Sequence, residues 1–392
     1  MSTIIFTEEF CQPERLFPFT LTRQIQDIRV GILTIREKWE MMLGLPSFDK
    51  KEDDYKDLER SVNIDETVGE EVCFIIHGNI LPTTKLIKAI NRLKNGEFIA
   101  DGKGAGIVFK VSKNEIKEKH KIKVSRAVDL KEEIKTIQYP WDIFQLNSWA
   151  IERDFELLTN NRKSQTISKT NSVTKSSRVF LQKGAKMEHC IINASAGPVY
   201  IGKNAEVMEG SYIRGPLALC EGAVLKMGSK VYGATTLGPY CIGGGEIKNS
   251  VLFGYSNKAH DGYLGDSVIG EWCNLGAGTT NSNLKNNAGP VKVWTPAGEM
   301  NAGIKCGVMM GDYSRTAINT SINTGTVISV SCNVFNTGLT PKYIPAFSWG
   351  SEGIKRYEFE KALNDIANWK KLKEKNITNN EKKILKYIFD HF

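Results

Sequence analysis

One stretch of the sequence holds side chains suited to acid–base chemistry and to binding an anion. His260 follows Lys248 and Lys258 and precedes Asp261 and Tyr263. Imidazole has the ordinary pKa closest to neutrality, so histidine is the usual general base, and lysine supplies a fixed positive charge for a phosphate. An isolated histidine is more often packed or solvated, but these polar neighbours favour the hypothesis that His260 is a catalytic base.

Two other chemistries need residue patterns that are weaker in this sequence. Covalent catalysis by Cys241 or Cys273 would need a base beside the thiol, and neither cysteine has one nearby. A zinc site like that of a γ-type carbonic anhydrase would need three converging histidines, and only His189 and His260 lie in the same part of the chain. No two of the eight cysteines form a CxxC pair, which predicts reduced thiols in a cytoplasmic protein.

A six-residue repeat predicts the element that carries His260. Residues 179–346 hold 25 of the 35 glycines. Every sixth residue from Ile201 to Leu237 is aliphatic, and two further registers run from Tyr263 and from Ile304. A period of six is typical of a hexapeptide β-helix with one inward aliphatic per unit. The alternative is a β-sandwich, whose strands would recur every 8–12 residues or so.

Two polar segments interrupt this repeat. Residues 242–262 contain His260, and residues 281–303 contain Asn283. We expect both segments to leave the coil as loops, because loops on a rigid repeat are where function is usually placed.

The composition divides the chain into four parts. Residues 1–158 are predicted to form an α/β domain, with strands at 4–6, 72–76 and 106–111 and a helix at 83–93. Residues 159–178 are polar and predict a linker, residues 179–346 predict the β-helix, and residues 347–392 predict a helical tail.

Several function classes are disfavoured. No apolar run approaches the roughly 18 residues of a membrane span, and the first residues lack the pattern of a secretory signal. The net charge of +8 is not gathered on one element, so we expect no nucleic-acid partner. We therefore expect a cytoplasmic protein that binds small anionic molecules.

The motifs around His260 resemble a known family. Lys258-Ala259-His260 is followed in one register by Tyr263-Leu264-Gly265-Asp266 and by Asn274-Leu275-Gly276-Ala277-Gly278-Thr279. This pattern is similar to the acetyltransferase half of the bifunctional glucosamine-1-phosphate acetyltransferase/N-acetylglucosamine-1-phosphate uridylyltransferase family. The segments 20–23, 29–39, 310–312 and 347–350 resemble a shorter bacterial branch of it.

The resemblance implies a fold and two coupled activities. The fold is an α/β nucleotidyltransferase-like domain, then a left-handed parallel β-helix that forms a homotrimer, then a helical tail. The activities are N-acetyl transfer from acetyl-CoA to glucosamine-1-phosphate and Mg²⁺-dependent transfer of a nucleotide, giving UDP-N-acetylglucosamine.

The resemblance also assigns residues of the acetyltransferase half. His260 matches the catalytic base, and Glu246 matches a carboxylate near the amino group of the sugar. Four residues match sugar-phosphate-binding positions: Lys248, Tyr263, Asn274 and Asn283. Ala277 matches a position where a backbone amide faces the acyl donor. These roles suit the chemistry, because a protonated amine must lose its proton before it can attack a thioester.

The first domain departs from the family pattern. No glycine precedes Gly31, so the usual glycine-rich phosphate loop is absent. Arg23, Arg29 and Lys38 are candidate nucleotide-phosphate ligands, and Asn79 and Asn147 are candidate metal ligands. An amide is a poorer ligand than a carboxylate for a hard cation. The alternative is therefore a sugar-nucleotide-binding or scaffolding protein with a degenerate first domain.

Overall fold

The computed structural model describes residues 2–51, 55–56, 60–62, 72–112, 116–117, 121–122, 124–130, 133–351 and 355–392. The chain forms two compact units. The first comprises Met1–Pro13, Arg23–Ile28 and Leu33–Gln138, and the second comprises Glu14–Thr22, Arg29–Ile32 and Tyr139–Phe392. Two short segments of the N-terminal region therefore belong to the second unit.

The first unit is built on a seven-stranded mixed sheet with the order β3-β2-β1-β4-β6-β5-β9. Its strands are β1 (Thr3–Thr7), β2 (Ser47–Lys50), β3 (Ser61–Val62), β4 (Cys73–His77), β5 (Glu97–Ala100), β6 (Gly106–Val111) and β9 (Arg126–Asp129). β4 is buried along its whole length, as expected for a central strand covered on both faces. The predicted strands and helix are confirmed, although the helix ends at Ile90.

The other elements of this unit are short. They are η3 (Ile25–Asp27), α1 (Ile35–Leu43), α3 (Thr84–Ile90) and the hairpin β7 (Ile116–Lys117) and β8 (Lys121–Ile122). α1 begins at a capping box formed by Thr34 and Glu37 and ends at Gly44, whose positive φ of 68° suits glycine.

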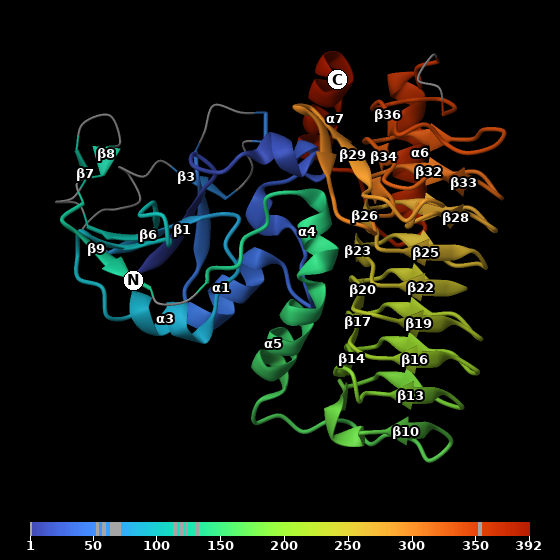
Figure 1. Ribbon diagram of the computed structural model, residues 1–392, viewed down its shortest axis with the longest axis horizontal. Coiled ribbons are helices and arrows are strands. Elements are labelled where there is room, and N and C mark those ends of the chain that lie inside the picture. Colours follow the sequence, from blue (N-terminus) through green and yellow to red (C-terminus); the bar gives the residue numbers. More distant parts are fainter. Residues whose placement is uncertain are drawn as a thin grey trace. The chain divides into compact units, whose positions relative to one another are not determined.

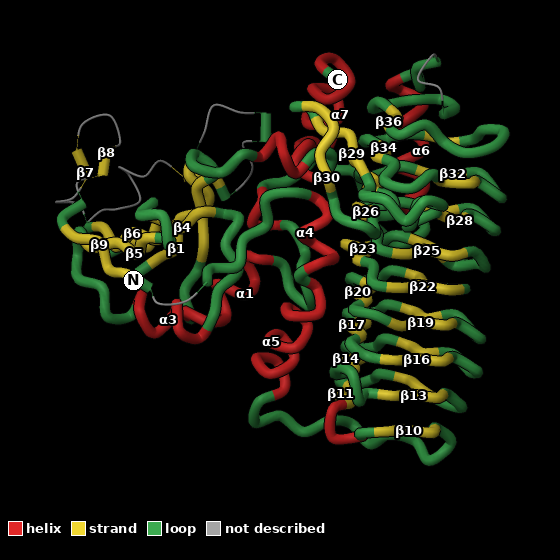
Figure 2. Tube along the Cα trace, viewed as in Figure 1, coloured by secondary structure: helices red, strands yellow, loops and turns green. Residues whose placement is uncertain are grey.

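The second unit contains a solenoid of parallel strands stacked coil upon coil (Figures 1 and 2). Its first face consists of β10 (Ser172–Thr174), β13 (Ile191–Asn193), β16 (Tyr212–Arg214), β19 (Lys230–Tyr232), β22 (Glu246–Lys248) and β25 (Tyr263–Gly265). The pair β28 (Thr280–Asn281) and β33 (Ser321–Ile322) follows in the same coil order. This confirms the predicted left-handed parallel β-helix and excludes a β-sandwich.

Two further sheets complete the solenoid. The second face consists of β11 (Val179–Leu181), β14 (Val199–Ile201), β17 (Leu217–Leu219), β20 (Thr235–Leu237), β23 (Val251–Gly254), β26 (Val268–Glu271), β31 (Met309–Met310), β34 (Val327–Ile328) and β36 (Tyr343–Ile344). The third face consists of β12 (Lys186–Met187), β15 (Glu206–Val207), β18 (Val224–Leu225), β21 (Ile242–Gly243), β24 (Asn257–Lys258), β27 (Asn274–Leu275), β32 (Arg315–Thr316) and β35 (Asn333–Val334).

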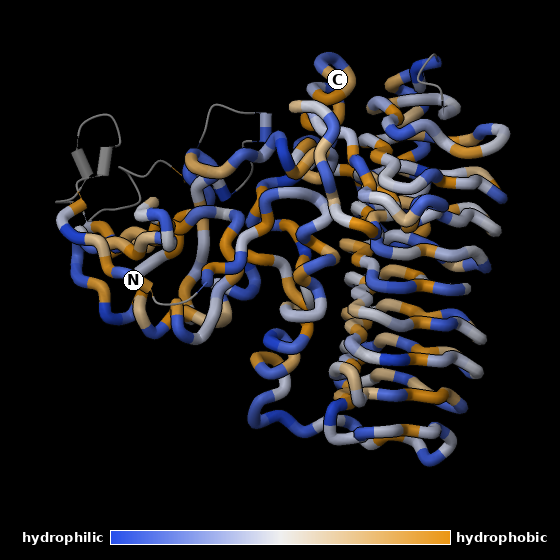
Figure 3. Tube along the Cα trace, in the orientation of Figure 1, coloured by the Kyte–Doolittle hydropathy of each residue, from blue (hydrophilic) through white to orange (hydrophobic). Residues whose placement is uncertain are grey.

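The six-residue repeat is explained by burial. The aliphatic residues of the first register, from Ile201 to Leu237, all lie in the core of the solenoid. Apolar and polar residues alternate along each coil in Figure 3, because each short strand sends one side chain inward and its neighbours outward. The predicted third register is wrong at Ile304, because this residue is 51% exposed and does not point into the core.

The predicted break at 242–262 is wrong. β21 to β25 continue the three faces through this segment. The coils only shorten: Leu219 pairs with Leu237, 18 residues later, whereas Leu237 pairs with Leu252, 15 residues later. Shorter turns shift the period of six while the parallel ladders continue, so the sequence pattern is lost and the fold is kept.

The predicted excursion at 281–303 is confirmed. Ile269 pairs with Met310, 41 residues later, so extra chain leaves the solenoid between two coils. Part of it forms the antiparallel hairpin of β29 (Lys292–Thr295) and β30 (Gly298–Asn301).

Helices flank the solenoid within the second unit. They are η1 (Pro13–Leu16), η2 (Phe19–Leu21), α4 (Pro140–Gln145), α5 (Asn147–Thr159), η6 (Ser176–Arg178), α6 (Phe359–Lys371) and α7 (Asn379–His391). α6 packs on the coils, with Lys370 over the ring of Trp272 at 4.8 Å. β10 lies inside the segment predicted as a linker, because its residues already pair with β13.

Among the described residues, no helix is long and apolar enough to cross a membrane.

Candidate active site at a corner of the solenoid

His260 lies at the corner between the third face and the first face. The register runs from Leu225 to Gly243 and from Gly243 to Lys258. Two residues farther along each coil, Gly245 and His260 therefore stack in one column. A Cβ on Gly245 would lie 2.8 Å from the carbonyl oxygen of His260, so glycine permits this close approach of two backbones.

The imidazole of His260 is open to solvent. The residue is exposed, and its ring makes no hydrogen bond to the residues that the structure describes. A general base needs this freedom, because its nitrogen must reach the proton of a substrate.

Carboxylate and phenol groups lie on the first face beside this corner. Glu246 and Tyr263 are paired across adjacent coils. The Tyr232 hydroxyl donates to the Glu246 carboxylate at 2.6 Å, and this hydrogen bond raises the pKa of Tyr232 to about 12. The Glu246 carboxylate is thereby held in place with a charge suited to an ammonium group.

Asn283 is fixed by two contacts. Its side-chain nitrogen donates to the Tyr263 hydroxyl at 3.1 Å and to the carboxylate of Asp266. Asp266 is 4% exposed and also accepts from the Asn249 side chain at 2.7 Å. Burial raises the pKa of Tyr263, and the nearby Asp266 adds to this shift. The tyrosine is therefore a neutral hydrogen-bonding group.

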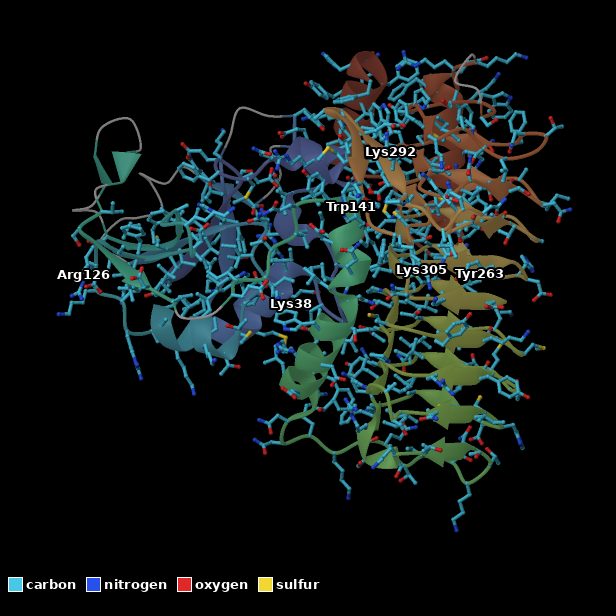
Figure 4. The ribbon with its side chains drawn as sticks, viewed as in Figure 1. Lys38, Arg126, Trp141, Tyr263, Lys292 and Lys305 are labelled. Atoms are coloured by element: carbon cyan, nitrogen blue, oxygen red, sulfur yellow. The ribbon has the colours of Figure 1, made fainter. Side chains whose placement is uncertain are left out.

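Lys248 lies on the first face, whereas Asn274 lies on the third face. Lys248 pairs with Tyr232 of the preceding coil, so its half-buried side chain lies two residues along the strand from Glu246. Asn274 begins β27 on the third face, where its side-chain oxygen accepts from Asn257 at 3.4 Å. Tyr263 is labelled on the solenoid in Figure 4.

Ala277 stacks above His260. Asn257 pairs with Asn274, and the Gly278 amide donates to the Asp261 carbonyl at 3.1 Å, so the turns at 259–262 and 276–279 lie on adjacent coils. The amide of Ala277 has no hydrogen-bond partner among the described residues. A free backbone N–H one coil from the imidazole is suited to stabilising an oxyanion.

The structure argues against the two alternative chemistries. Cys241 and Cys273 are buried, and burial raises the pKa of the Cys241 thiol to about 12. His189 occupies the same corner column as His260 but lies four coils away, roughly 19 Å at the usual strand spacing. The two imidazoles cannot share a zinc ion.

The first unit contains a cavity of about 420 Å³ beyond the carboxyl end of β4. Its lining includes Phe10, His77, Asn79, Asp101 and Phe109. Phe10 stacks on the His77 ring with centroids 5.2 Å apart. Burial lowers the pKa of His77 to about 4, and its Nε2 has no partner among the described residues. This cavity, which is lined by aromatic rings and a neutral imidazole, lies at a switch point of the sheet, where α/β proteins bind ligands.

One of the two candidate metal ligands, Asn147, uses its side chain in hydrogen bonds within the fold. Asn147 is fully buried in the second unit, and its Oδ1 accepts from the Gly31 amide at 2.7 Å and from Thr236 at 3.1 Å. Its Nδ2 donates to the Ala234 carbonyl, so Asn147 joins segments of the fold. Asn79 lines the cavity, but the described residues contain no group of three histidine, cysteine or carboxylate side chains around a metal position.

The candidate phosphate ligands are also placed differently. Arg29 donates to the Phe253 carbonyl at 3.1 Å, so it holds an N-terminal segment on β23. Arg23 and Lys38 are 8% and 3% exposed, and neither belongs to the described lining of the cavity. The long side chain of Arg29 is thus used within the fold, which its sequence pattern does not reveal.

An internal carboxylate occupies the loop after β1. Glu8 is 7% exposed, accepts from the Ile25 amide at 2.5 Å and pairs with Lys56 at 3.6 Å. A triphosphate would have to compete with this carboxylate for the same groups.

Tyr232, which orients Glu246, was missed from the sequence. Asp266 and Lys258 were noticed in the motif, but the sequence did not show that Asp266 orients Asn283 or that Lys258 points into the core. The coil register would have found Tyr232, since it is paired with Lys248.

Comparisons with known proteins agree with this two-part architecture. A sugar nucleotidyl transferase family model matches residues 3–163. The chain is 29% identical over 249 residues to a bifunctional sugar-1-phosphate nucleotidylyltransferase/acetyltransferase of Sulfurisphaera tokodaii, covering 57% of this chain and 53% of that protein. It is 37% identical over 87 residues to the bifunctional protein GlmU of Methanocaldococcus jannaschii, covering 22% and 21%. The matched regions thus span about half or less of these two relatives.

Two further matches are to acyltransferases. The chain is 31% identical over 170 residues to an uncharacterized acetyltransferase, YaiX, of Escherichia coli, covering 40% of this chain and 67% of that protein. A crystal structure of a UDP-N-acetylglucosamine acyltransferase matches 58% of this chain and 95% of its own, with 13% identity and a TM-score of 0.20.

Fold and sequence together define a nucleotidyltransferase-like unit joined to a hexapeptide-repeat solenoid. The chain belongs to the GlmU-type family.

Proposed function

We propose that the solenoid is a sugar-phosphate N-acetyltransferase that uses acetyl-CoA and glucosamine-1-phosphate. The observation that carries this proposal is the corner where the exposed His260, the Glu246–Tyr263 pair and the free Ala277 amide come together. The names of the relatives support the same reaction class.

Each of these residues has its own role in the proposed reaction. The Glu246 carboxylate attracts the amino group of the sugar, and Lys248, Tyr263 and Asn283 supply a cation and hydrogen bonds for the sugar phosphate. His260 takes a proton from the nitrogen as it attacks the thioester carbonyl. The Ala277 amide stabilises the oxyanion. Collapse of the tetrahedral intermediate breaks the C–S bond, and the leaving sulfur takes the proton from His260 and departs as the CoA thiol.

Replacing His260 by alanine tests the proposal. We expect kcat for thiol release from acetyl-CoA with glucosamine-1-phosphate to fall by roughly 10²- to 10⁴-fold, because the amine loses its general base. His189→Ala is the matched control, since His189 lies in the same corner column without the acceptor residues. Equal rates for His260→Ala and His189→Ala would remove His260 from the mechanism.

We propose that the first unit supports sugar-1-phosphate nucleotidyl transfer, coupled to the solenoid's reaction to give UDP-N-acetylglucosamine. The family match to residues 3–163 supports this proposal. The second candidate is a unit that binds a sugar nucleotide without turnover, favoured by Glu8 at the Ile25 amide and by the missing metal cluster among the described residues. Pyrophosphate release from UTP, N-acetylglucosamine-1-phosphate and Mg²⁺ would exclude this candidate.

We also propose a homotrimer in a reducing, cytoplasmic compartment. Exposed Ile191 and Tyr212 on adjacent coils of the first face support contact with a second copy of the chain. None of the eight cysteines, all of them among the described residues, forms a disulfide, which supports a reducing compartment.

A further inference from the structure

Lys258 occupies an inward-facing position that aliphatic residues fill in earlier coils of the solenoid. The paired residues of the third face that precede it in the same inward column are Met187, Val207, Leu225 and Gly243. The first three are core residues, and Lys258 is 1% exposed. Its predecessor in the column is Gly243, where an added Cβ would lie 2.5 Å from Leu237 and 3.1 Å from Ile247, so the core around this glycine is already filled.

The ammonium group of Lys258 joins two turns. It donates to the Gly244 carbonyl at 3.2 Å and to the carbonyl of His260 itself. These carbonyls belong to successive coils, and a Cβ on Gly244 would lie 2.4 Å from the Ala259 carbonyl oxygen. Lys258 therefore fastens the turn of residues 259–262, which we call the His260 turn, to the coil beneath it.

This arrangement costs stability. Burial lowers the pKa of Lys258 to about 8, and Asp261 compensates only in part. An aliphatic side chain would fill the column without removing a charge from water. A buried charge at a position that suits an aliphatic residue is characteristic of a functional site, where local stability is given up.

We infer that Lys258 is a positioning residue that holds the backbone of His260 so that the imidazole faces the acceptor on the first face. The inference rests on the proposed acetyl transfer for its kinetic consequence, while the ordering of the turn is independent of it. Lys258 is buried and donates to the carbonyl of His260, so it acts through His260.

Lys258→Met tests this role, because methionine keeps the length and removes the cation. We expect kcat for acetyl transfer to fall by roughly 10- to 100-fold, the usual cost of a misplaced catalytic group, with KM for both substrates within about threefold. The melting temperature should stay at or above that of the wild type. Leu225→Ala is the control: it lies two coils away in the same column, so it should lower the melting temperature and keep kcat within about threefold.

Hydrogen exchange of the amides at residues 259–262 gives a second readout that needs no activity. We expect faster exchange in this segment of Lys258→Met, and unchanged exchange in residues 199–225. Should the wild type release no thiol while the His260 turn still loosens in Lys258→Met, the proposed function fails and the positioning role stands. Unchanged exchange, unchanged kcat in an active enzyme, or a Lys258→Met chain that does not fold would each overturn the inference.

Discussion

At the residue scale, the site depends on polar groups whose positions are set by other polar groups. Tyr232 holds Glu246, and Asp266 holds Asn283. Both supporting partners lie on neighbouring coils or turns of the same face, so the register of the ladders decides which residues meet. His260 is the exception, because its ring makes no hydrogen bond within the described part of the chain and only its backbone is held.

The stability of the protein should depend on pH through Lys258. Its folded pKa is about 8 and its ordinary value is 10.5, so the unfolded chain binds this proton more tightly. The free energy of unfolding should therefore rise between pH 8 and pH 10.5, by up to roughly 3 kcal/mol, and be lowest below pH 8.

Urea unfolding of the wild type and of Lys258→Met at pH 7.5 and pH 10 measures this contribution. Groups common to both chains cancel in the difference. A difference that stays constant between the two pH values would contradict the shifted pKa.

At the scale of elements, the close packing of successive turns positions the base. Gly245 and Gly228 have nearly the same positive φ, 69° and 68°. A Cβ on Gly245 would meet the backbone of the His260 turn at 2.8–3.0 Å, whereas a Cβ on Gly228 would meet nothing within 4 Å.

Alanine at these two glycines separates backbone strain from crowding. Both variants should lose about 1 kcal/mol from the positive φ. Gly245→Ala should lose a further 1–3 kcal/mol or so from overpacking, and its kcat for acetyl transfer should fall because the His260 turn is displaced. Thermal unfolding and thiol release measure the two effects, and equal behaviour of both variants would refute the argument from crowding.

At the scale of the whole molecule, the first face of the solenoid has apolar side chains that the described residues leave exposed. Ile191 is 49% exposed and Tyr212 is 55% exposed, and they are paired on adjacent coils. In a monomer this surface would stay in contact with water.

Tyr212→Glu should therefore shift the chain from trimer to monomer, because it places a charge in an apolar contact. Sedimentation velocity measures the change. Met227→Glu is the control, since Met227 is 67% exposed at a corner of the solenoid. A monomeric wild type, or a trimer that tolerates Tyr212→Glu, would contradict the proposed assembly.

The sequence by itself determined the repeating architecture, because one inward aliphatic per six residues leaves a periodic trace. It also determined that His260 stands among groups suited to acid–base chemistry. Both signals are local: they depend on residues close together in the chain.

Only the tertiary structure decided where the coils shorten and which long polar side chains are buried within the fold. The coil at 242–262 keeps its ladders while its period changes, so the pattern alone predicted a break. Asn147 and Arg29 bond to Ala234 and Phe253, residues about 90 and more than 200 positions away, and Lys258 turns into a core that only neighbouring coils create. Contacts between distant segments leave no local pattern, which is why the supporting residues of this site were found only in the folded chain.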